Sequence, residues 1–286
     1  MAIKIISACL LFIAHTALCQ TAFTYRGPSF EGDQRFEYEH QLLKLALDKT
    51  SQKYGEYILS PSDPMNVART VRKVKNGTSA NFFPNFAFRP QYSNLLDYVP
   101  IPTHRGIVGY RIFFTNEQKQ SQLSNVNSVN ALKPFTFVQG QNWLDTDILL
   151  ANGLNVLALE NHESLFLFID KGRADIFPRG IHEIQEEYQH YKTKISNLKM
   201  DNHLALHYPA PRFFYTTKGN KDALMRVYKG LQLAWADGSF IALWHKFYQH
   251  SINQAQMSKR HIIELHNPEL GTLSNTYGQY MYRVGE

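Results

Sequence analysis

The chain has 286 residues, a length that suits one large domain or two medium-sized ones. With 44% hydrophobic and 19% charged residues, its composition is that of a globular protein and excludes an intrinsically disordered chain. The net charge of +6 is scattered, and the densest basic group, at residues 69–75, is expected to be the solvated face of a helix, so no nucleic-acid-binding patch is predicted. A positive balance of this kind still attracts anionic solutes.

The N-terminus is predicted to be an export signal. Lys4 provides a small basic region, and residues 5–14 form an apolar core that is too short for a stable membrane span. Small residues stand at the two positions that a signal peptidase reads, the second of them Cys19. Residues 1–19 are therefore expected to be removed before Gln20, which places the mature protein in the periplasm.

Both cysteines of the sequence, Cys9 and Cys19, lie within this segment. A cleaved chain would carry no thiol, which excludes a disulfide framework, a cysteine metal site and a cysteine nucleophile. The alternative to cleavage is a lipoprotein anchored through an acylated Cys19, although Leu18 stands where a small residue is wanted. No later run reaches about 18 apolar residues, so no other membrane span is expected.

Strands and helices alternate through the first part of the mature chain. Strands are expected at residues 22–25, 57–60 and 81–83, and helices at residues 36–54 and 64–75. Asp63 is the expected N-cap of the second helix, with Pro64 at its first position. Pro84 ends the third strand, because proline cannot donate a ladder hydrogen bond. The residues that follow, 85–102, are expected to be irregular.

The middle of the chain repeats this alternation between two longer extended segments. Residues 107–114 and 204–208 are expected to be crossovers between two lobes. Between them, strands are predicted at residues 135–138, 155–159 and 174–177, and helices at residues 146–151, 163–171 and 181–194. Strands that alternate with helices favour parallel pairing, and ligands of such sheets lie beyond the carboxyl ends of the strands. The loops at residues 140–143 and 178–180 are therefore expected to face a ligand.

The last part of the chain is expected to return to the first lobe. It contains a predicted strand at residues 213–216 and two predicted helices, at residues 221–236 and 240–248. A break at residues 237–239 separates the helices. No role is assigned to the tail from Glu264 onward.

A short pattern occurs twice. Residues 75–85 and residues 171–179 both read as a helix end, a glycine, a short strand, Phe-Pro and a polar residue. One interpretation is coincidence in a chain rich in phenylalanine and proline. The other is a pair of similar lobes, each of which presents one polar loop to a shared cleft.

The order of these elements resembles the bacterial periplasmic solute-binding proteins, in particular the polar amino-acid receptors of ABC transporters. Three motifs carry the resemblance: KGRAD at residues 171–175, similar to that family's G-R-x-D step; ADGSF at residues 236–240, similar to its D-G-S/T break; and GQNW at residues 140–143, similar to its G-T/S turn. The resemblance covers residues 22–248. It implies an α/β, two-lobed fold of type II with two hinge crossovers, in which residues 20–106 and 207–286 form the first lobe, residues 107–206 form the second, and both close on a ligand.

The resemblance also implies ligand-binding positions. In amino-acid-binding members, an arginine past the third strand clamps the α-carboxylate, and Arg89 stands at that place; a guanidinium matches a planar carboxylate. The aspartate that such members use for the α-amino group falls here at Arg179, a departure that favours a second anionic or a neutral polar group. Trp143 could stack on a flat ligand. The candidate ligand-binding residues are Arg26, Asn85, Arg89, Tyr110, Asn142, Trp143 and Arg179.

Each main candidate also has a purely structural interpretation. Arg89 could pair with a surface acid such as Asp97, and Arg179 with Glu183. Trp143 could belong to the core, and Tyr110 could serve only to pack the hinge.

Three functions are compared. The first is a monomeric extracytoplasmic receptor that binds a small polar solute, amino-acid-like or an organic acid, and passes it to an ABC permease or a sensor without chemistry, cofactor or metal. The second is a sensor or scaffold module with a degenerate cleft. The third is an exported hydrolase, but residues 182–190 lack the second histidine that a zinc helix needs four positions after the first, and no G-x-S-x-G elbow occurs.

Overall fold

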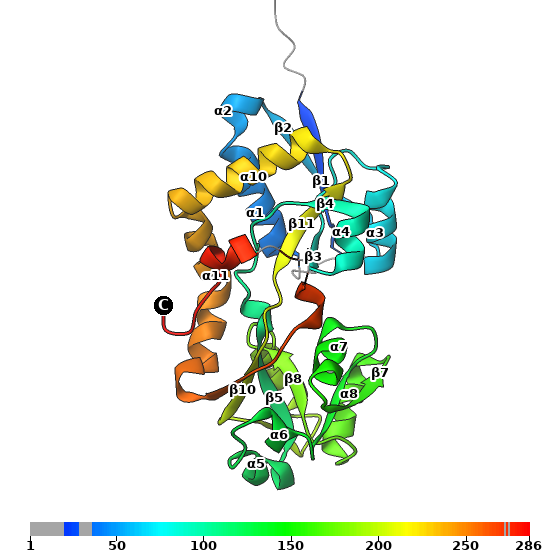
Figure 1. Ribbon diagram of the computed structural model, residues 1–286, viewed down its shortest axis with the longest axis vertical. Coiled ribbons are helices and arrows are strands. Elements are labelled where there is room, and N and C mark those ends of the chain that lie inside the picture. The colour runs from blue at the N-terminus through cyan, green and yellow to red at the C-terminus, as the bar shows by residue number, and fades with distance from the viewer. Residues whose placement is uncertain (1–19, 29–35, 272, 274) are drawn as a thin grey trace, which may run out of the picture.

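The computed structural model describes residues 20–28, 36–271, 273 and 275–286. The expected export signal lies outside these residues. Two lobes are stacked along the long axis of the molecule (Figure 1). Among the described helices, none combines the length and the apolar character needed to cross a membrane.

The first lobe is built on two small sheets. Strands β1 (Thr21–Tyr25) and β2 (Tyr57–Pro61) pair in parallel, and a bridge between Thr24 and Phe82 extends this layer. Strand β11 (Arg212–Thr217) lies between β3 (Asn85–Ala87) and β4 (Leu96–Tyr98), antiparallel to both. The chain therefore resumes a strand beyond Pro84, because β11, which arrives from far along the sequence, supplies the pairing partner.

The described helices associated with this lobe are α1 (Glu37–Asp48), α2 (Ser51–Tyr54), α3 (Val67–Lys75), α4 (Pro90–Leu95), α10 (Lys221–Ala236) and α11 (Ser239–Ala255). Helix α11 packs on α1 and α10. Helix α3 begins three residues later than expected, because the Asn66 side chain, and not Asp63, accepts a hydrogen bond from the backbone of Arg69. Helices α1 and α10 cross closely, since a Cβ at Gly230 would lie 1.9 Å from the carbonyl oxygen of Ala46.

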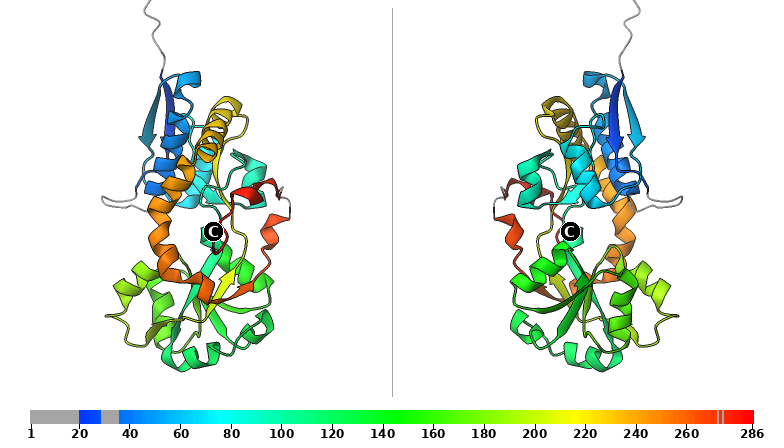
Figure 2. Two further views of the ribbon diagram at one scale, coloured as in Figure 1. Left: turned by 90° about the vertical axis from the view of Figure 1, so that its left-hand side faces the viewer. Right: turned by 90° about the vertical axis from the view of Figure 1, so that its right-hand side faces the viewer.

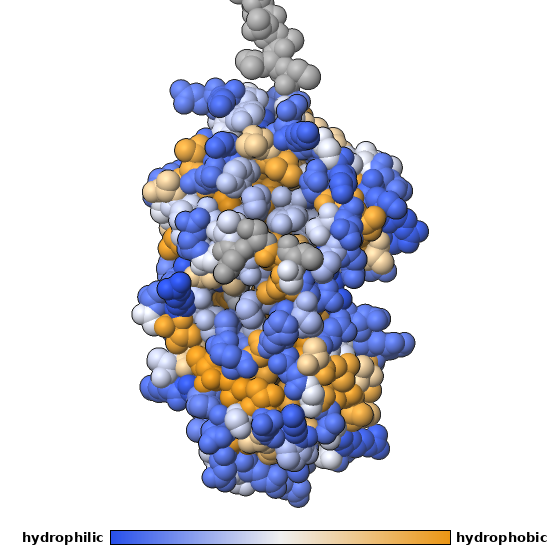
Figure 3. Space-filling view, in the orientation of Figure 1, coloured by the Kyte–Doolittle hydropathy of each residue, from blue (hydrophilic) through white to orange (hydrophobic). Residues whose placement is uncertain are grey.

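The second lobe is organised around β5 (Tyr110–Asn116), whose residues are all buried. Antiparallel partners of β5 are β8 (Phe177–Gly180), β9 (Leu198–Met200) and β10 (Leu204–His207), and β12 (His261–Glu264) runs parallel to β10. Strands β6 (Thr136–Gly140) and β7 (Asn155–Leu159) form a parallel pair that a bridge from Phe137 to Ile176 joins to the rest. The helices are α5 (Glu117–Leu123), α6 (Val129–Leu132), α7 (Leu144–Ala151), α8 (His162–Asp170) and α9 (Ile184–Tyr191). Figure 3 shows a broad apolar band across one face of this lobe.

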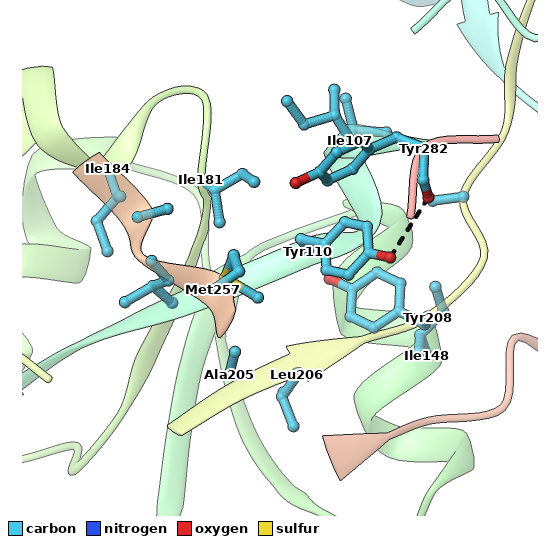
Figure 4. Packing of buried hydrophobic residues seen from close by; sticks show 14 of the residues in the cluster. Ile107, Tyr110, Ile148, Ile181, Ile184, Ala205, Leu206, Tyr208, Met257 and Tyr282 are labelled. Carbon is cyan, nitrogen blue, oxygen red and sulfur yellow. Dashed lines mark hydrogen bonds between the residues drawn. The ribbon is translucent and has the colours of Figure 1, made fainter. Parts of the chain in front are cut away.

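The two hinge segments, residues 99–109 and 208–211, lie next to the expected crossover strands. They run side by side, since the backbone of Tyr208 donates to the carbonyl of Gly109, and a Cβ at Gly109 would lie 2.1 Å from the carbonyl oxygen of Tyr208. Only glycine allows this approach. Figure 4 shows the buried side chains around this junction, with the Tyr110 hydroxyl directed at the carbonyl oxygen of Tyr282, 3.5 Å away.

The C-terminal part of the chain adds two more crossings. After α11 the chain enters the second lobe as β12, and Asn152 of that lobe holds the backbone of His266 by hydrogen bonds of 2.7 and 3.0 Å. The chain then returns to the first lobe, where Tyr277 packs against Phe213. Helix α11 and this returning segment flank the waist of the molecule on opposite sides (Figure 2). The expected assignment of residues 207–286 to the first lobe therefore does not describe β12.

Arg105 fastens the returning segment to the first hinge. Its buried guanidinium lies 2.5 Å from Glu286, donates to the carbonyl of Tyr280 at 3.2 Å, and lies 4.7 Å from the centre of the Trp244 ring. The backbone of Tyr282 donates in turn to the carbonyl of Arg105 at 2.6 Å. The described residues 265–271, 273 and 275–286, which we call the C-terminal brace, thus hold the hinge through Arg105.

We expect Arg105→Met to lower the free energy of unfolding by about 2 to 3 kcal/mol, through loss of a charged hydrogen bond and a cation–π contact. Urea unfolding measures this change. Arg69→Met is the matched control: Arg69 is an exposed arginine on α3, so its replacement is expected to change the free energy of unfolding by less than about 0.5 kcal/mol. Equal effects of both substitutions would contradict the role given to Arg105.

Candidate ligand-binding site

A cavity of about 430 Å³ lies between the lobes. The first lobe lines it with Arg26, Phe36, Val67, Asn85, Phe86, Ala87, Arg89, Tyr92 and Arg212. The hinges and the second lobe line it with Val108, Arg111, Asn142, Trp143, Leu144, Asp145, Tyr208 and Ala210. The lining thus contains four arginines and one carboxylate, together with several aromatic rings.

Arg212 is held in place by the strand opposite it. Strands β11 and β3 pair antiparallel, so Asn85 lies beside Arg212 and accepts hydrogen bonds from its Nε at 2.8 Å and its Nη2 at 3.2 Å. Asn85 is itself buried and donates to Thr103 at 2.7 Å. Among the described residues, Nη1 of Arg212 has no protein partner, so the side chain is fixed while one nitrogen stays available to a ligand.

Arg89 connects the two lobes. It is the N-cap residue of α4, ahead of Pro90, and its Nη2 lies 3.0 Å from the carboxylate of Asp147 in the first turn of α7. A carboxylate in the first turn also complements the helix dipole. The Arg89 side chain is 15% exposed and that of Asp147 is 45% exposed. The pair is therefore partly hydrated, and a ligand anion could replace Asp147 on the guanidinium.

The floor of the cavity in the second lobe is a closed network of charges. Arg111 contacts Asp145 at 2.7 Å, Glu183 at 3.2 Å and the hydroxyl of Tyr208 at 2.8 Å, and that hydroxyl donates to Asp145. Burial lowers the pKa of Arg111, but Asp145, Tyr208 and Glu183 together raise that pKa above its ordinary value. Burial raises the pKa of Glu183, yet Arg179, His182 and Arg111 hold that pKa well below its usual range. Both charges of Arg111 and Glu183 thus persist inside the protein, and the network neutralises itself.

Five of the residues predicted from the sequence line the cavity: Arg26, Asn85, Arg89, Asn142 and Trp143. Asn142 adopts a left-handed backbone (φ 64°), a conformation that asparagine tolerates. Trp143 lies over Gly140, where a Cβ would come within 2.1 Å of the indole. The loop at residues 140–143 therefore presents these two side chains to the cavity.

Arg179 and Tyr110, also predicted, do not line the cavity. Arg179 forms a bidentate pair with Glu187 (2.6 and 2.7 Å) beneath the indole of Trp143, whose centre lies 5.1 Å away. The physical reason is that α9 follows Arg179 directly and brings Glu183 and Glu187 back to it. Tyr110 stacks on His207 and packs the hinge.

Arg111, Arg212, Asp145 and Tyr208 line the cavity but were missed. Arg111 and Arg212 are the only charged residues of β5 and β11, and an arginine in such a strand requires a charged or polar partner. That signal was present in the sequence. The identity of the partners was not, because Asp145 and Asn85 come from distant segments.

A buried carboxyl group lies behind Arg212. Glu39 is 8% exposed, and its Oε1 lies 3.6 Å from Arg212 and 3.5 Å from His104, while its Oε2 has no hydrogen-bond partner among the described residues. Burial raises the pKa of Glu39 to about 7, against the influence of Arg212 and Arg26. Burial lowers the pKa of His104 well below its ordinary value, so the histidine is neutral and the contact is not an ion pair.

Because the pKa of Glu39 is higher in the folded protein than in the unfolded chain, its contribution to stability is greatest below pH 4.5 and is lost as the pH rises through about 7. Glu39→Gln removes this titration. We expect the variant to gain up to about 3 kcal/mol relative to the parent between pH 5 and pH 8. Urea unfolding across this range measures the change; the other charged or titratable groups around Glu39 are Arg212, Arg26, His104, Tyr38 and Tyr248. A difference that does not vary with pH would contradict the assignment.

No protein-family model and no curated protein matches the sequence. Solved structures do match. An ancestral arginine-binding protein bound to arginine superposes with a TM-score of 0.54 at 14% identity, over 80% of this chain and 98% of that one. A Salmonella typhimurium periplasmic binding protein of high arginine specificity superposes with 0.53 at 8% identity, over 80% and 99%. The L-cystine solute receptor of Neisseria gonorrhoeae, in its unliganded open conformation, superposes with 0.51 at 14% identity, over 80% and 92%.

These matches confirm the expected architecture. They cover 80% of this chain, and at such identities they establish the fold alone. The chain therefore has the α/β type II periplasmic-binding-protein fold, in which it resembles the polar amino-acid receptors of ABC transporters.

Proposed function

We propose that this protein is an extracytoplasmic receptor that binds a small polar solute with an anionic group between its lobes and passes it to an ABC permease or a sensor. The observation that carries the proposal is the interlobe cavity of about 430 Å³, lined by four arginines and one carboxylate. A cavity of this size suits a small molecule. Export rests on the N-terminal sequence, and the proposal includes no chemical step.

The arginines support binding of an anion because they are fixed before the ligand arrives. Asn85 orients Arg212, and Asp145 and Glu183 orient Arg111. A preorganised site loses little side-chain entropy on binding. The neighbouring structures suggest the same mode of action, since one is named as a periplasmic binding protein of high arginine specificity and another as an L-cystine solute receptor.

The C-terminal brace favours a second candidate function, a sensor. When the cleft opens, two further connections must bend as well as the two hinges: the connection after α11 and the segment that Asn152 and Arg105 hold. Such a molecule is suited to closures of small amplitude. Small-angle scattering with and without ligand separates the two candidates: a receptor with wide opening changes its radius of gyration, whereas a braced sensor does not.

We expect a ligand of the predicted type, at a hundred times its dissociation constant, to add about 2.7 kcal/mol of stability. This corresponds to a rise of roughly 5 to 10 °C in the melting temperature for a chain of this size. Differential scanning fluorimetry against amino acids, organic acids, sugars and polyamines measures the shift, and native mass spectrometry of freshly purified protein detects a retained ligand. The proposal fails if no compound shifts the melting temperature and no bound mass is found.

Asp147→Asn removes the carboxylate that bridges Arg89 to the second lobe. The ion pair between Arg89 and Asp147 is partly exposed, so we expect its loss to destabilise the closed form relative to the open form by no more than about 1 kcal/mol. The fraction of molecules in the open form would then rise by up to about fivefold. Small-angle scattering of the ligand-free protein measures this change. The matched control is Asp63→Asn, which removes the same charge from a 3.8 Å contact with Lys73 inside the first lobe. Identical scattering from the two variants would contradict the bridging role.

A further inference from the structure

We propose that the cavity selects an organic carboxylate that has no ammonium group and carries a flat, apolar body. This inference rests on the proposed receptor function and specifies the class of solute. It follows from two independent features of the lining, the state of its carboxylates and the shape of its apolar surface.

The carboxylates around the cavity are already committed to arginines. Asp145 contacts Arg111 at 2.7 Å and also accepts from Tyr208. Asp147 contacts Arg89 at 3.0 Å. Within the described part of the chain, Asp145 is the only carboxylate that lines the cavity, and Arg111 already neutralises it through Oδ1. An ammonium group would have to share Asp145 with Arg111, and the neighbouring guanidinium would repel it.

Guanidinium nitrogens, in contrast, remain available. The contacts of Arg212 leave its Nη1 without a protein partner among the described residues, and Arg89 meets Asp147 through Nη2 alone. Both arginines belong to the first lobe and line the same cavity. A ligand carboxylate can therefore be bound by Arg212 at once, whereas Arg89 becomes available by exchange with Asp147.

The rest of the lining suits a flat apolar body. Phe86 and Tyr92, whose ring centres lie 5.6 Å apart, line the first-lobe side, and Trp143 and Leu144 line the second-lobe side. The indole of Trp143 is held rigidly, with Arg179 5.1 Å from its centre and Gly140 against its ring. Rigid aromatic surfaces contribute most to the binding of a planar ligand.

The experiment compares matched pairs that differ only in the ammonium group: phenylalanine with 3-phenylpropionate, tryptophan with 3-(indol-3-yl)propionate, and glutamate with glutarate. Protein unfolded in urea and refolded, to remove any retained ligand, is titrated by calorimetry. We expect each aromatic acid to bind at least about tenfold more tightly than its amino acid, and more tightly than glutarate. Phenyl phosphate tests the alternative oxyanion, and tighter binding of phenyl phosphate than of 3-phenylpropionate would overturn the carboxylate assignment.

The other outcomes separate this inference from the receptor proposal. If an amino acid binds as tightly as its deaminated partner, or if only a sugar or a polyamine binds, the inference is overturned while the receptor function stands. If nothing in these sets or in the wider panel binds, both are overturned.

Two variants, Arg212→Gln and Glu39→Gln, and one control, Arg173→Gln, test the role of Arg212. We expect Arg212→Gln to weaken binding of the best aromatic acid by about 10- to 100-fold, through loss of a charge-assisted hydrogen bond. Arg173→Gln, which removes the same charge from an exposed site in the second lobe, is expected to change affinity less than about twofold. Glu39→Gln keeps Arg212 and removes the carboxylate behind it, so affinity at pH 8 should rise by about two- to fivefold. Unchanged affinity in Glu39→Gln, or equal effects of Arg212→Gln and Arg173→Gln, would overturn the role of Arg212.

Discussion

Buried guanidinium groups in this molecule need partners, and most of the architecture around the waist provides them. Arg105, Arg111 and Arg179 are each more than nine-tenths buried, and each lies within 3.2 Å of a carboxylate oxygen. An unpaired charge at such depth would destabilise the fold by several kcal/mol. The partners of Arg105 and Arg111 come from distant segments, so these two arginines connect the hinges, the second lobe and the C-terminal brace, whereas Arg179 pairs with the helix that follows it.

The same requirement divides the arginines into two groups. Those whose charge is fully matched, such as Arg111 and Arg179, support the walls of the cavity. Arg89 and Arg212 are only partly matched, by a half-exposed aspartate and by a carboxyl group whose pKa is about 7. Positive charge is thus left over on one side of the cavity, which is where an anion gains most by binding.

The C-terminal brace restricts the movement of one lobe against the other. Arg105 joins the hinge to residues 280–286, and β12 joins the end of α11 to the sheet of the second lobe. The movement of one lobe against the other must therefore deform four connections. Glu39 and His104 lie near the same hinge, so the charge of a buried carboxyl is placed where it can act both on Arg212 and on the stability of the waist.

Much of the fold was accessible from the sequence. Apolar spacing placed α1, α10 and α11, and the alternation of strands with helices indicated an α/β fold of two lobes, because these signals are local. Arg89, Asn142 and Trp143, which strand ends and helix starts pointed to, line the cavity. Pairings between distant segments were not accessible. Arg212 became a candidate only when β11 was paired with β3 and Asn85. Arg179 was expected to meet a ligand and instead pairs with Glu183 and Glu187 of the helix that follows it; the contact with Glu183 was the structural alternative that the sequence offered. The sequence by itself determined the long helices and several strands, and that arginines would lie near strand ends, but it did not reveal β3, α4 and β4 in the segment expected to be irregular. Only the tertiary structure decided which of those arginines are neutralised, because the charge that each one faces comes from residues up to 181 positions away.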